Sequence, residues 1–327
     1  MRHLNRFEAP PPAGVDNRKY LPIAVDTLEP SEDLPFNLYR ESDAGQEFLP
    51  YVNQHARLRP AQLKSLSESH VATLYIPFFD RHFYQAHLER LFLRSRELPA
   101  ARAMSVIKAK ARSIFCGSIS DARLASTIHE SRALAEQIAD VMISNALTSD
   151  DLVRLMTHDY CTYTHATNVC VWCVALARTM GFNAHGDLVA IAQGALLHDL
   201  GKRHIPYKII NKNGSLTRHE RDLVEDHPRR GFLDVCEGHG LSWPQLMMIY
   251  QHHERPDGRG YPVGLSAEAI HSWAKLCSVA DVFDAMTAVR PYHSSASPVQ
   301  ALENMVKQVG TQFDKETLQC FVKMMAL

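Results

Sequence analysis

Histidines and aspartates recur along the second half of this 327-residue chain, at the ends or on the inner faces of segments with the pattern of apolar helices. The set comprises His165, His198, Asp199, His227, His252, His253 and Asp281. A single helical histidine is more often a hydrogen-bonded core or surface residue than a ligand. Seven such groups beside strongly apolar segments are costly to desolvate without a partner, and a metal ion supplies that partner.

The types of these residues narrow the metal and its chemistry. Imidazole and carboxylate ligands without thiolate suit iron(II), manganese(II) or zinc, and a carboxylate next to a histidine can bridge two ions. A binuclear centre lowers the pKa of a shared water and neutralises charge on the oxygens of a phosphodiester during in-line attack. The residue types therefore favour a metal centre that could act on a phosphodiester.

The two adjacent histidines open the stretch HHERPDGRGYP, residues 252–262. Its DG and GYP segments are turn sequences, since glycine tolerates positive φ and proline fixes its own φ. We expect a tight loop in which Tyr261 packs on the helices. Glu254, Arg255 and Arg259 are expected to fix this loop, and an arginine that meets substrate is the alternative.

Four segments, in order and at family-like spacing, resemble the successive signatures of HD-GYP domains. They are LLHDLGK (residues 196–202), EDHPRRG (225–231), HHERPDGRGYP (252–262) and VADVFDAMTAVRPY (279–292). HD-GYP domains are cyclic-di-GMP phosphodiesterases of the HD phosphohydrolase superfamily, and the resemblance covers roughly residues 135–327. It implies a helical fold, a metal centre, and hydrolysis of cyclic di-GMP to pGpG or GMP through a metal-bridging hydroxide.

The resemblance also implies roles within the set. One ion is expected on four residues, namely His165, His198, Asp199 and Asp281. Asp199 is expected to bridge to a second ion, which is held by His227, His252 and His253. Asp284, one helical turn after Asp281 on the same face, is expected to orient a ligand histidine by a hydrogen bond, the alternative being a place among the ligands.

Two basic side chains are expected to contact the substrate phosphate. Lys202 matches the lysine of the family's HDxGK segment. Arg290 matches the arginine of its RPY segment, whose forked donors can clamp a phosphate. We therefore expect Asp199 and Lys202 as catalytic residues, and Lys202 and Arg290 as substrate-binding residues.

Two positions depart from the family's pattern. Cys161 stands where members with three ions carry a glutamate, so we expect two metal ions, iron or manganese, rather than three. His293 stands where many members carry a lysine after RPY, which weakens one expected phosphate contact. The alternatives are a catalytically weak receptor for cyclic dinucleotides, and an enzyme that prefers another cyclic dinucleotide such as cyclic GMP-AMP.

The elements that must position these residues are mainly helices. Asp187 is expected to cap a helix that runs toward His198. Thr217-x-x-Glu220 forms a capping box for the helix before the second motif. Pro244 suits the first turn of a helix that leads to the histidine pair. The sequence therefore predicts a bundle of helices that converge on one centre.

The rest of the chain predicts three further regions. Residues 1–20, with three consecutive prolines, are expected to form a flexible tail, and residues 96–134 a helical connector. Residues 21–95 contain short runs rich in Val, Ile, Tyr and Phe, which predict a small α/β module with a regulatory or dimerisation role. The expected fold class is mainly α: a helical-bundle HD-GYP domain at residues 135–327, preceded by the α/β domain and the connector.

Composition limits the partners that the chain can have. Its 35 basic and 36 acidic residues leave a net charge of −1, so no molecular field draws it to nucleic-acid polymers or membranes. Seven scattered cysteines make no disulfide framework, and Cys170 and Cys173 are expected on a packed helix face. No apolar segment of signal-peptide length begins the sequence, so we expect a cytoplasmic protein. The expected partners are cyclic di-GMP, diguanylate cyclases at the GYP loop, and a second copy in a homodimer.

Overall fold

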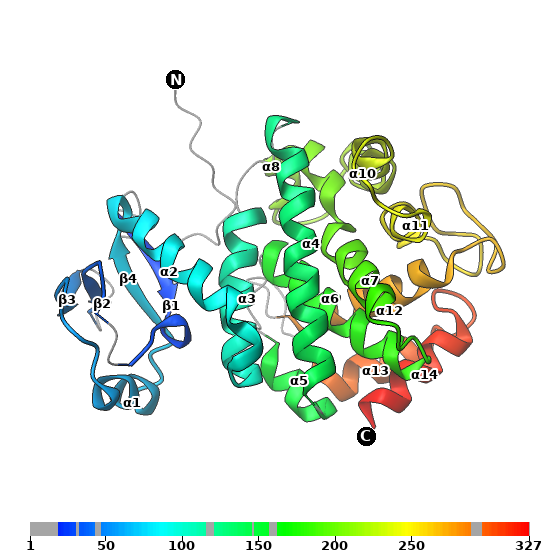
Figure 1. Ribbon diagram of the computed structural model, residues 1–327. Helices are drawn as coiled ribbons and strands as arrows, with labels where there is room; N and C mark the ends of the chain where they lie inside the picture. Colours follow the sequence, from blue (N-terminus) through cyan, green and yellow to red (C-terminus); the bar gives the residue numbers. More distant parts are fainter. Residues whose placement is uncertain are drawn as a thin grey trace. The chain divides into compact units, whose positions relative to one another are not determined.

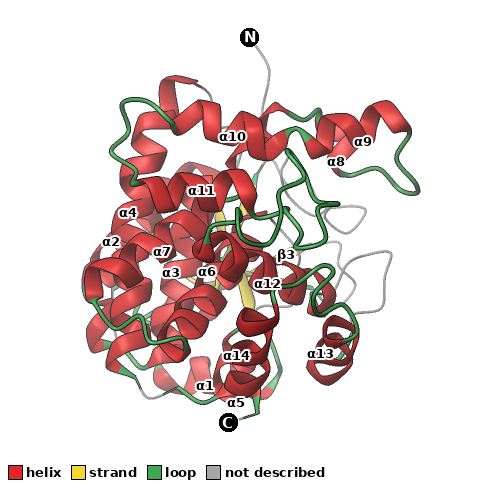
Figure 2. Cartoon of the chain, turned by 90° about the vertical axis from the view of Figure 1, so that its right-hand side faces the viewer, coloured by secondary structure: helices red, strands yellow, loops and turns green. Residues whose placement is uncertain are grey.

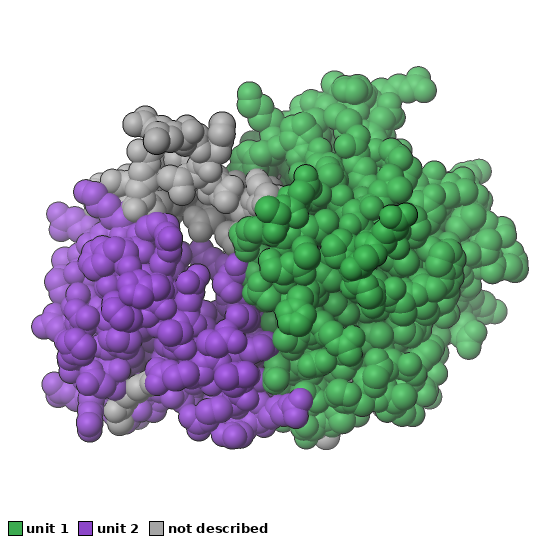
Figure 3. All heavy atoms as spheres, turned by 45° about the horizontal axis from the view of Figure 1, so that its top comes forward, with its two compact units in different colours: residues 1–7, 114–327 green, residues 8–113 purple. Residues whose placement is uncertain are grey.

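A computed structural model describes residues 19–30, 33–42, 47–115, 121–145, 147–156, 162–288 and 296–326. The chain divides between Ser113 and Ile114 into two compact units (Figure 3). Each unit has a hydrophobic core of its own. The division falls inside the segment expected as a helical connector, and the domain bounds expected from the sequence stay a prediction.

The N-terminal unit is built on an antiparallel sheet with the strand order β1-β4-β2-β3 (Figure 1). Its strands are β1 (Tyr20–Ala24), β2 (Leu38–Glu41), β3 (Phe48–Val52) and β4 (Thr73–Pro77), and its helices are α1 (Pro60–Glu68), α2 (Arg81–Leu93) and α3 (Ala100–Phe115). Over the first four residues of β4, the buried Leu74 and Ile76 alternate with the exposed Thr73 and the half-buried Tyr75, as the two-residue period of a strand requires. Leu88 of α2 joins the same core. The expected small α/β module is confirmed.

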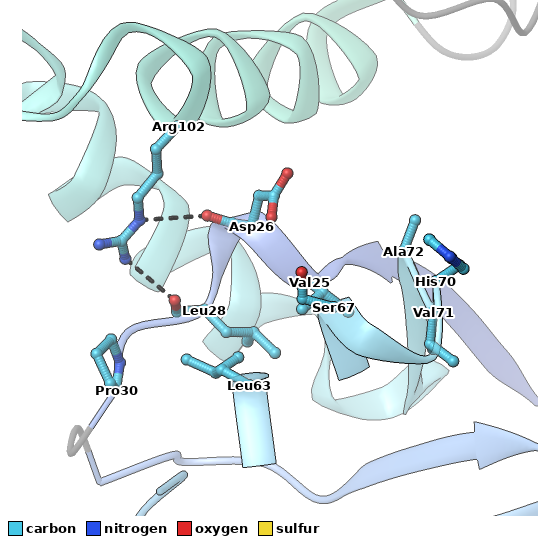
Figure 4. Close-up of a pocket in the computed structure, with 10 residues that line it drawn as sticks. All are labelled: Val25, Asp26, Leu28, Pro30, Leu63, Ser67, His70, Val71, Ala72 and Arg102. Atoms are coloured by element: carbon cyan, nitrogen blue, oxygen red, sulfur yellow. Dashed lines mark hydrogen bonds between the residues drawn. The ribbon is translucent and has the colours of Figure 1, made fainter. Parts of the chain in front are cut away.

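A shallow hollow of about 490 Å³ lies in this unit beside a short 3-10 turn, Val25–Thr27 (Figure 4). Leu28 and Leu63 contribute apolar surface to it. At its rim, Arg102 from α3 donates hydrogen bonds to the carbonyl oxygens of Asp26 (3.3 Å) and Leu28 (3.1 Å). The guanidinium also pairs with Oε1 of Glu29 at 3.4 Å, so it ties α3 to the turn and to the residues that follow it.

The C-terminal unit is almost entirely helical (Figures 1 and 2). Its helices are α4 (Asp121–Ser144), α5 (Ser149–Leu155), α6 (Thr162–Thr179), α7 (His185–Leu197), α8 (Tyr207–Ile210), α9 (Arg218–Glu225), α10 (His227–Val235), α11 (Trp243–Gln251), α12 (Ser272–Thr287), α13 (Pro298–Val306) and α14 (Lys315–Met325), with a 3-10 turn η4 (Leu200–His204) after α7. Helix α6 is central, because α4, α7, α12 and α14 all pack against it. The expected fold class, mainly α, is confirmed. Among the described helices, none combines the length and the apolar character needed to cross a membrane.

Most of the expected helix signals act as predicted. Thr217 and Glu220 form a reciprocal capping box at the start of α9, and Pro244 lies in the first turn of α11. Cys170 and Cys173 are buried free thiols on α6. The expected cap at Asp187 is wrong: α7 begins two residues earlier, with Ala184 as its N-cap. Asp187 instead lies in the first turn, where its charge faces the positive end of the helix dipole.

Candidate metal centre

The predicted ligands lie mainly at helix ends that meet at one place in the C-terminal unit. Helix α7 ends at Leu197 and is followed directly by His198 and Asp199, and α11 ends at Gln251 and is followed by the two adjacent histidines. The remaining three ligands come from the first residue of α10 and from the buried faces of α6 and α12; they are His227, His165 and Asp281. All seven predicted ligands are thus described, and all are brought to one centre.

One group of possible ligands consists of His165, His198 and Asp199, whose ligand atoms lie within 4.8 Å of one another. Oδ2 of Asp199 is 3.8 Å from Nε2 of His165 and 3.4 Å from Nε2 of His198. Asp281 approaches the same side, because its Oδ1 lies 3.0 Å from Nε2 of His165. These four residues are the set expected for the first ion.

A second group consists of Asp199, His227, His252 and His253, again within 4.8 Å. Oδ1 of Asp199 is 3.3 Å from Nε2 of His227 and 3.9 Å from Nε2 of His252. Asp199 therefore belongs to both groups and directs one carboxylate oxygen to each. This is the geometry that a bridging carboxylate requires.

Hydrogen bonds to the backbone direct three imidazole rings toward the centre. Nδ1 lies 2.7 Å from the carbonyl oxygen of the residue three positions earlier in both His198 and His227, and 3.0 Å in His252. A carbonyl oxygen only accepts, so Nδ1 carries the proton in each ring and the lone pair of Nε2 faces inward. This tautomer is inferred from the hydrogen bonds. It is the tautomer that binds a metal through Nε2.

These inward-facing atoms lack partners that would satisfy them. Nε2 of His227 and Nε2 of His252 are 3.2 Å apart, and neither has a proton to give when both Nδ1 atoms are protonated. Nε2 of His198 and Oδ1 of Asp199 are buried without a hydrogen-bond partner. Opposed lone pairs and an unsatisfied carboxylate oxygen are unfavourable in a buried site unless a cation lies between them. The residues present therefore fit metal ions.

The pKa shifts differ between the carboxylate side of the centre and its outer histidine. Burial acts to raise the pKa of Asp199, but Lys202 and His198 outweigh it and hold the pKa well below its usual range. Burial acts to lower the pKa of His198, yet the negative charges of Asp199 and Asp281 raise it to about 9. Burial lowers the pKa of His253 to about 3. The same field that favours a proton on His198 favours a metal cation in its place.

His165 is oriented by a chain of hydrogen bonds from α12 and α6. Oδ2 of Asp284 lies 2.7 Å from Nδ1 of His165, and Oδ1 of Asp284 accepts from Nδ2 of Asn168 at 2.9 Å. The hydrogen bond expected from Asp284 to a ligand histidine is thus present. Asn168 was not singled out from the sequence, although its position three residues after His165 on α6 places both on one helix face.

Lys202 lies at the edge of the centre and contacts Asp199, one of the predicted metal ligands. Its Nζ donates to Oδ2 of Asp199 at 2.6 Å, and its side chain is 27% exposed. The contact with substrate phosphate expected from the sequence is not tested by this geometry. Arg290, the other expected phosphate contact, lies outside the described residues, as do Cys161 and His293.

Two glycines bring the backbone of η4 against the backbone of α10. A Cβ atom on Gly201 would lie 1.9 Å from the carbonyl oxygen of His227 and 2.5 Å from the nitrogen of Gly231. A Cβ on Gly231 would in turn lie 3.0 Å from the nitrogen of Gly201. This close approach places the segment that carries Asp199 directly against the start of α10. It therefore keeps Asp199 close to His227, the first residue of α10.

The GYP loop closes over the outer histidine. The ring of Tyr261 lies against the ring of His253, with centroids 4.7 Å apart. Arg255 forms two hydrogen bonds with the carboxylate of Asp257, at 3.0 and 2.7 Å. Glu254 accepts hydrogen bonds from the backbone of residues 263–265. The expected packing of Tyr261 and the loop-fixing role of Glu254 and Arg255 are therefore present.

A helical unit with a histidine–aspartate centre of this kind defines an HD-type fold. The HD domain family model matches residues 148–317, and the chain belongs to this family. Within the family it has the HD-GYP fold: it is similar over 94% of its length to the solved structure of Bd1817, an HDG"Y"P protein from Bdellovibrio bacteriovorus, with a TM-score of 0.66 and 20% identity. The resemblance to HD-GYP domains is confirmed.

Curated relatives agree with this assignment. The chain is 37% identical over 227 residues to cyclic di-GMP phosphodiesterase PA4108 from Pseudomonas aeruginosa. The aligned region covers 68% of the chain and 54% of the relative. It is 38% identical over 150 residues to the response regulator RpfG, a cyclic di-GMP phosphodiesterase from Xanthomonas campestris, which covers 45% and 39%. It is 32% identical over 167 residues to 3'3'-cGAMP-specific phosphodiesterase 1 from Vibrio cholerae, which covers 50% and 37%. These matches span about half of each relative or less.

Proposed function

We propose that this chain is a metal-dependent phosphodiesterase that hydrolyses cyclic di-GMP to pGpG, GMP or both. The observation that carries the proposal is Asp199, whose two oxygens face two separate groups of histidines. A pair of cations bridged by one carboxylate suits an in-line displacement at phosphorus. The names of the relatives from Pseudomonas and Xanthomonas support cyclic di-GMP as the substrate.

Each proposed ion has a defined set of residues. His165, His198, Asp199 and Asp281 would hold the first ion, and Asp199, His227, His252 and His253 the second. Imidazole and carboxylate ligands suit iron or manganese, which we propose as the resident metals. When bound, the ions would activate a water and offset the charge of the phosphoryl oxygens.

The chain's own residues would prepare the site for an anionic substrate. Lys202 places a positive charge next to Asp199 and retains partial exposure, so its Nζ can meet a phosphate oxygen that enters the centre. We propose that it stabilises the charge that develops on that oxygen during hydrolysis. Arg290 remains a predicted second contact for the phosphate.

The test combines metal analysis with an assay of hydrolysis. The full chain, purified without chelator, should contain about two transition-metal ions per molecule and convert cyclic di-GMP to a linear product. The Asp199→Ala variant should lose both metal and activity, whereas Asp187→Ala, at an exposed position on α7, should keep both. Wild-type protein that contains no transition metal, or an active Asp199→Ala variant, would refute the proposal.

A second candidate substrate is 3'3'-cGAMP, because a relative with 32% identity is named for that substrate. Parallel assays with both dinucleotides separate the two, since the preferred one gives the higher kcat/KM. Stoichiometric binding of a dinucleotide without any product would instead favour the receptor alternative. A cytoplasmic location, diguanylate cyclases as partners of the loop, a homodimer and a regulatory N-terminal unit stay predictions.

A further inference from the structure

Glu254 follows the histidine pair directly and is 2% exposed. Its Oε1 accepts from the backbone nitrogens of Val263 (2.8 Å) and Gly264 (3.2 Å), and its Oε2 from those of Gly264 (3.0 Å) and Leu265 (2.9 Å). Within the described part of the chain, no lysine, arginine or histidine forms an ion pair with it. A buried carboxylate is therefore satisfied entirely by three consecutive backbone N–H groups.

The segment that Glu254 binds, residues 263–265, directly follows the GYP motif. It is the returning half of the GYP loop, which we take as residues 254–265. The outgoing half has its own attachments, because Arg255 pairs with Asp257 and the nitrogen of Asp257 donates to the carbonyl oxygen of Thr311 at 3.1 Å. The hydrogen bonds that fix residues 263–265, by contrast, all end on Glu254 among the side-chain contacts described. The two halves thus have different attachments, and one backbone bridge, between Asp257 and Ser266, joins them directly.

Between the two halves lies Tyr261, which covers the outer histidine of the centre. Its backbone nitrogen donates to the carbonyl oxygen of His253 at 3.2 Å, and its ring lies at 33° to the imidazole with centroids 4.7 Å apart. Gly260 permits this approach, because a Cβ there would lie 2.4 Å from the nitrogen of Arg255. The side chain of His253 is 24% exposed, whereas those of His227 and His252 are fully buried. The other near rings of His253 are those of His252 (4.1 Å) and His227 (5.1 Å), so Tyr261 supplies the cover that comes from the loop.

We propose that Glu254 is a positioning residue for the metal centre: by holding residues 263–265 it keeps Tyr261 on His253 and so fixes the angle of that imidazole. In the described part of the chain, the hydrogen bonds of the Glu254 side chain all go to the backbone of residues 263–265 and none to a predicted metal ligand. The inference rests on the proposed function only in taking His253 as a ligand. Partners that orient a ligand in this way typically change metal affinity by about 10-fold to 100-fold when they are removed.

The test uses the full chain and follows His253 directly by NMR of histidine-labelled, metal-free protein. In Glu254→Gln, an amide replaces the carboxylate. Its NH₂ group only donates, and its single oxygen cannot accept from all three N–H groups. The His253 side-chain resonances should move toward the positions that they take in Tyr261→Leu, which removes the stacked ring. Glu220→Gln is the matched control, because Glu220 also accepts a backbone N–H, from Thr217, but lies far along the chain in α9.

Metal affinity provides the second readout. Calorimetry with Mn²⁺ should show affinity about 10-fold to 100-fold weaker in Glu254→Gln and an intermediate loss in Glu254→Asp, which keeps the charge but shortens the reach. Unmoved His253 resonances with wild-type affinity in a folded Glu254→Gln would overturn the inference, as would unmoved resonances in Tyr261→Leu. If circular dichroism shows Glu254→Gln unfolded, Glu254→Asp decides by the same criteria. None of these readouts uses cyclic di-GMP, so a failure of the proposed hydrolysis is distinguishable from a failure here.

Discussion

Gly201→Ala should both destabilise the C-terminal unit and disturb the metal centre. The new Cβ would lie 1.9 Å from the carbonyl oxygen of His227, where ordinary contact begins near 3.4 Å. The two segments must therefore separate by about 1.5 Å, the difference between those distances. The three atoms nearest to the new Cβ, at 1.9, 2.5 and 2.9 Å, are all backbone atoms, so no flexible side chain can move aside to relieve these contacts.

The magnitude follows from this geometry. Overpacking a well-packed site costs about 1–3 kcal/mol, and rigid backbone on both sides favours the upper end of that range. Separation also moves Asp199 away from His227. In the wild-type structure, Oδ1 of Asp199 lies 3.3 Å from Nε2 of His227. A displacement of about 1 Å at a reacting centre can cost about 10²-fold in rate. We therefore expect a loss of about 3 kcal/mol in unfolding free energy, and weaker binding of metal.

Tryptophan fluorescence during urea unfolding of metal-free protein measures this loss. The three tryptophans, Trp172, Trp243 and Trp273, all lie in the C-terminal unit, so the signal reports that unit alone. Gly186→Ala is the control, since a Cβ there meets nothing within 4 Å and alanine favours a helix by up to about 1 kcal/mol. If Gly201→Ala unfolds within about 0.5 kcal/mol of wild type and takes up Mn²⁺ normally, the backbone contact does not set the spacing of the ligands.

Three further predictions test other parts of the centre. Asp284→Asn should weaken Mn²⁺ binding about 10-fold to 100-fold in calorimetry, because Nδ1 of His165 loses its charged partner; unchanged affinity would contradict the orienting role. Lys202→Gln should keep its metal content but hydrolyse cyclic di-GMP about 10²-fold to 10³-fold more slowly, and an unchanged kcat would exclude Lys202 from the reaction. The hydrogen bond from Lys212, and then that from the Thr217 backbone, lower the pKa of Glu220 from 4.5 to about 2. Wild type should therefore be more stable than Glu220→Gln above pH 4.5 and lose that advantage as the pH falls toward 2, and an equal acid transition in both proteins would contradict this.

The sequence predicts the elements of the fold better than their arrangement. Helices could be recognised because their apolar periodicity and their caps are local, as at Thr217 and Pro244. The strands of the N-terminal unit could be recognised in the same way, but the order β1-β4-β2-β3 depends on pairing between distant segments. The cap at Asp187 failed because an acidic residue is favourable both as an N-cap and within the first turn, and the sequence does not distinguish the two.

The same division holds at the metal centre. The candidate ligands could be proposed from the sequence because buried histidine and aspartate next to apolar segments need a partner, and because their segments resemble HD-GYP motifs. The supporting contacts could be foreseen only in part. Asp284 and Glu254 could be singled out by their positions next to predicted ligands, but the bond from Asn168 to Asp284, across 116 positions, and the backbone groups that Glu254 binds could not. Lys202 is an intermediate case: its bond to Asp199 spans three positions, which is a spacing that local reasoning can read.

Asp199 ties the two groups of ligands together in a way that affects how they can be studied. If that carboxylate serves two ions, as proposed, a cation on one side would change the affinity of the other side, and the effect would be reciprocal. No substitution at Asp199 can therefore report on one group by itself. Variants that separate the two must be made at residues that belong to only one group, such as His198 or His252.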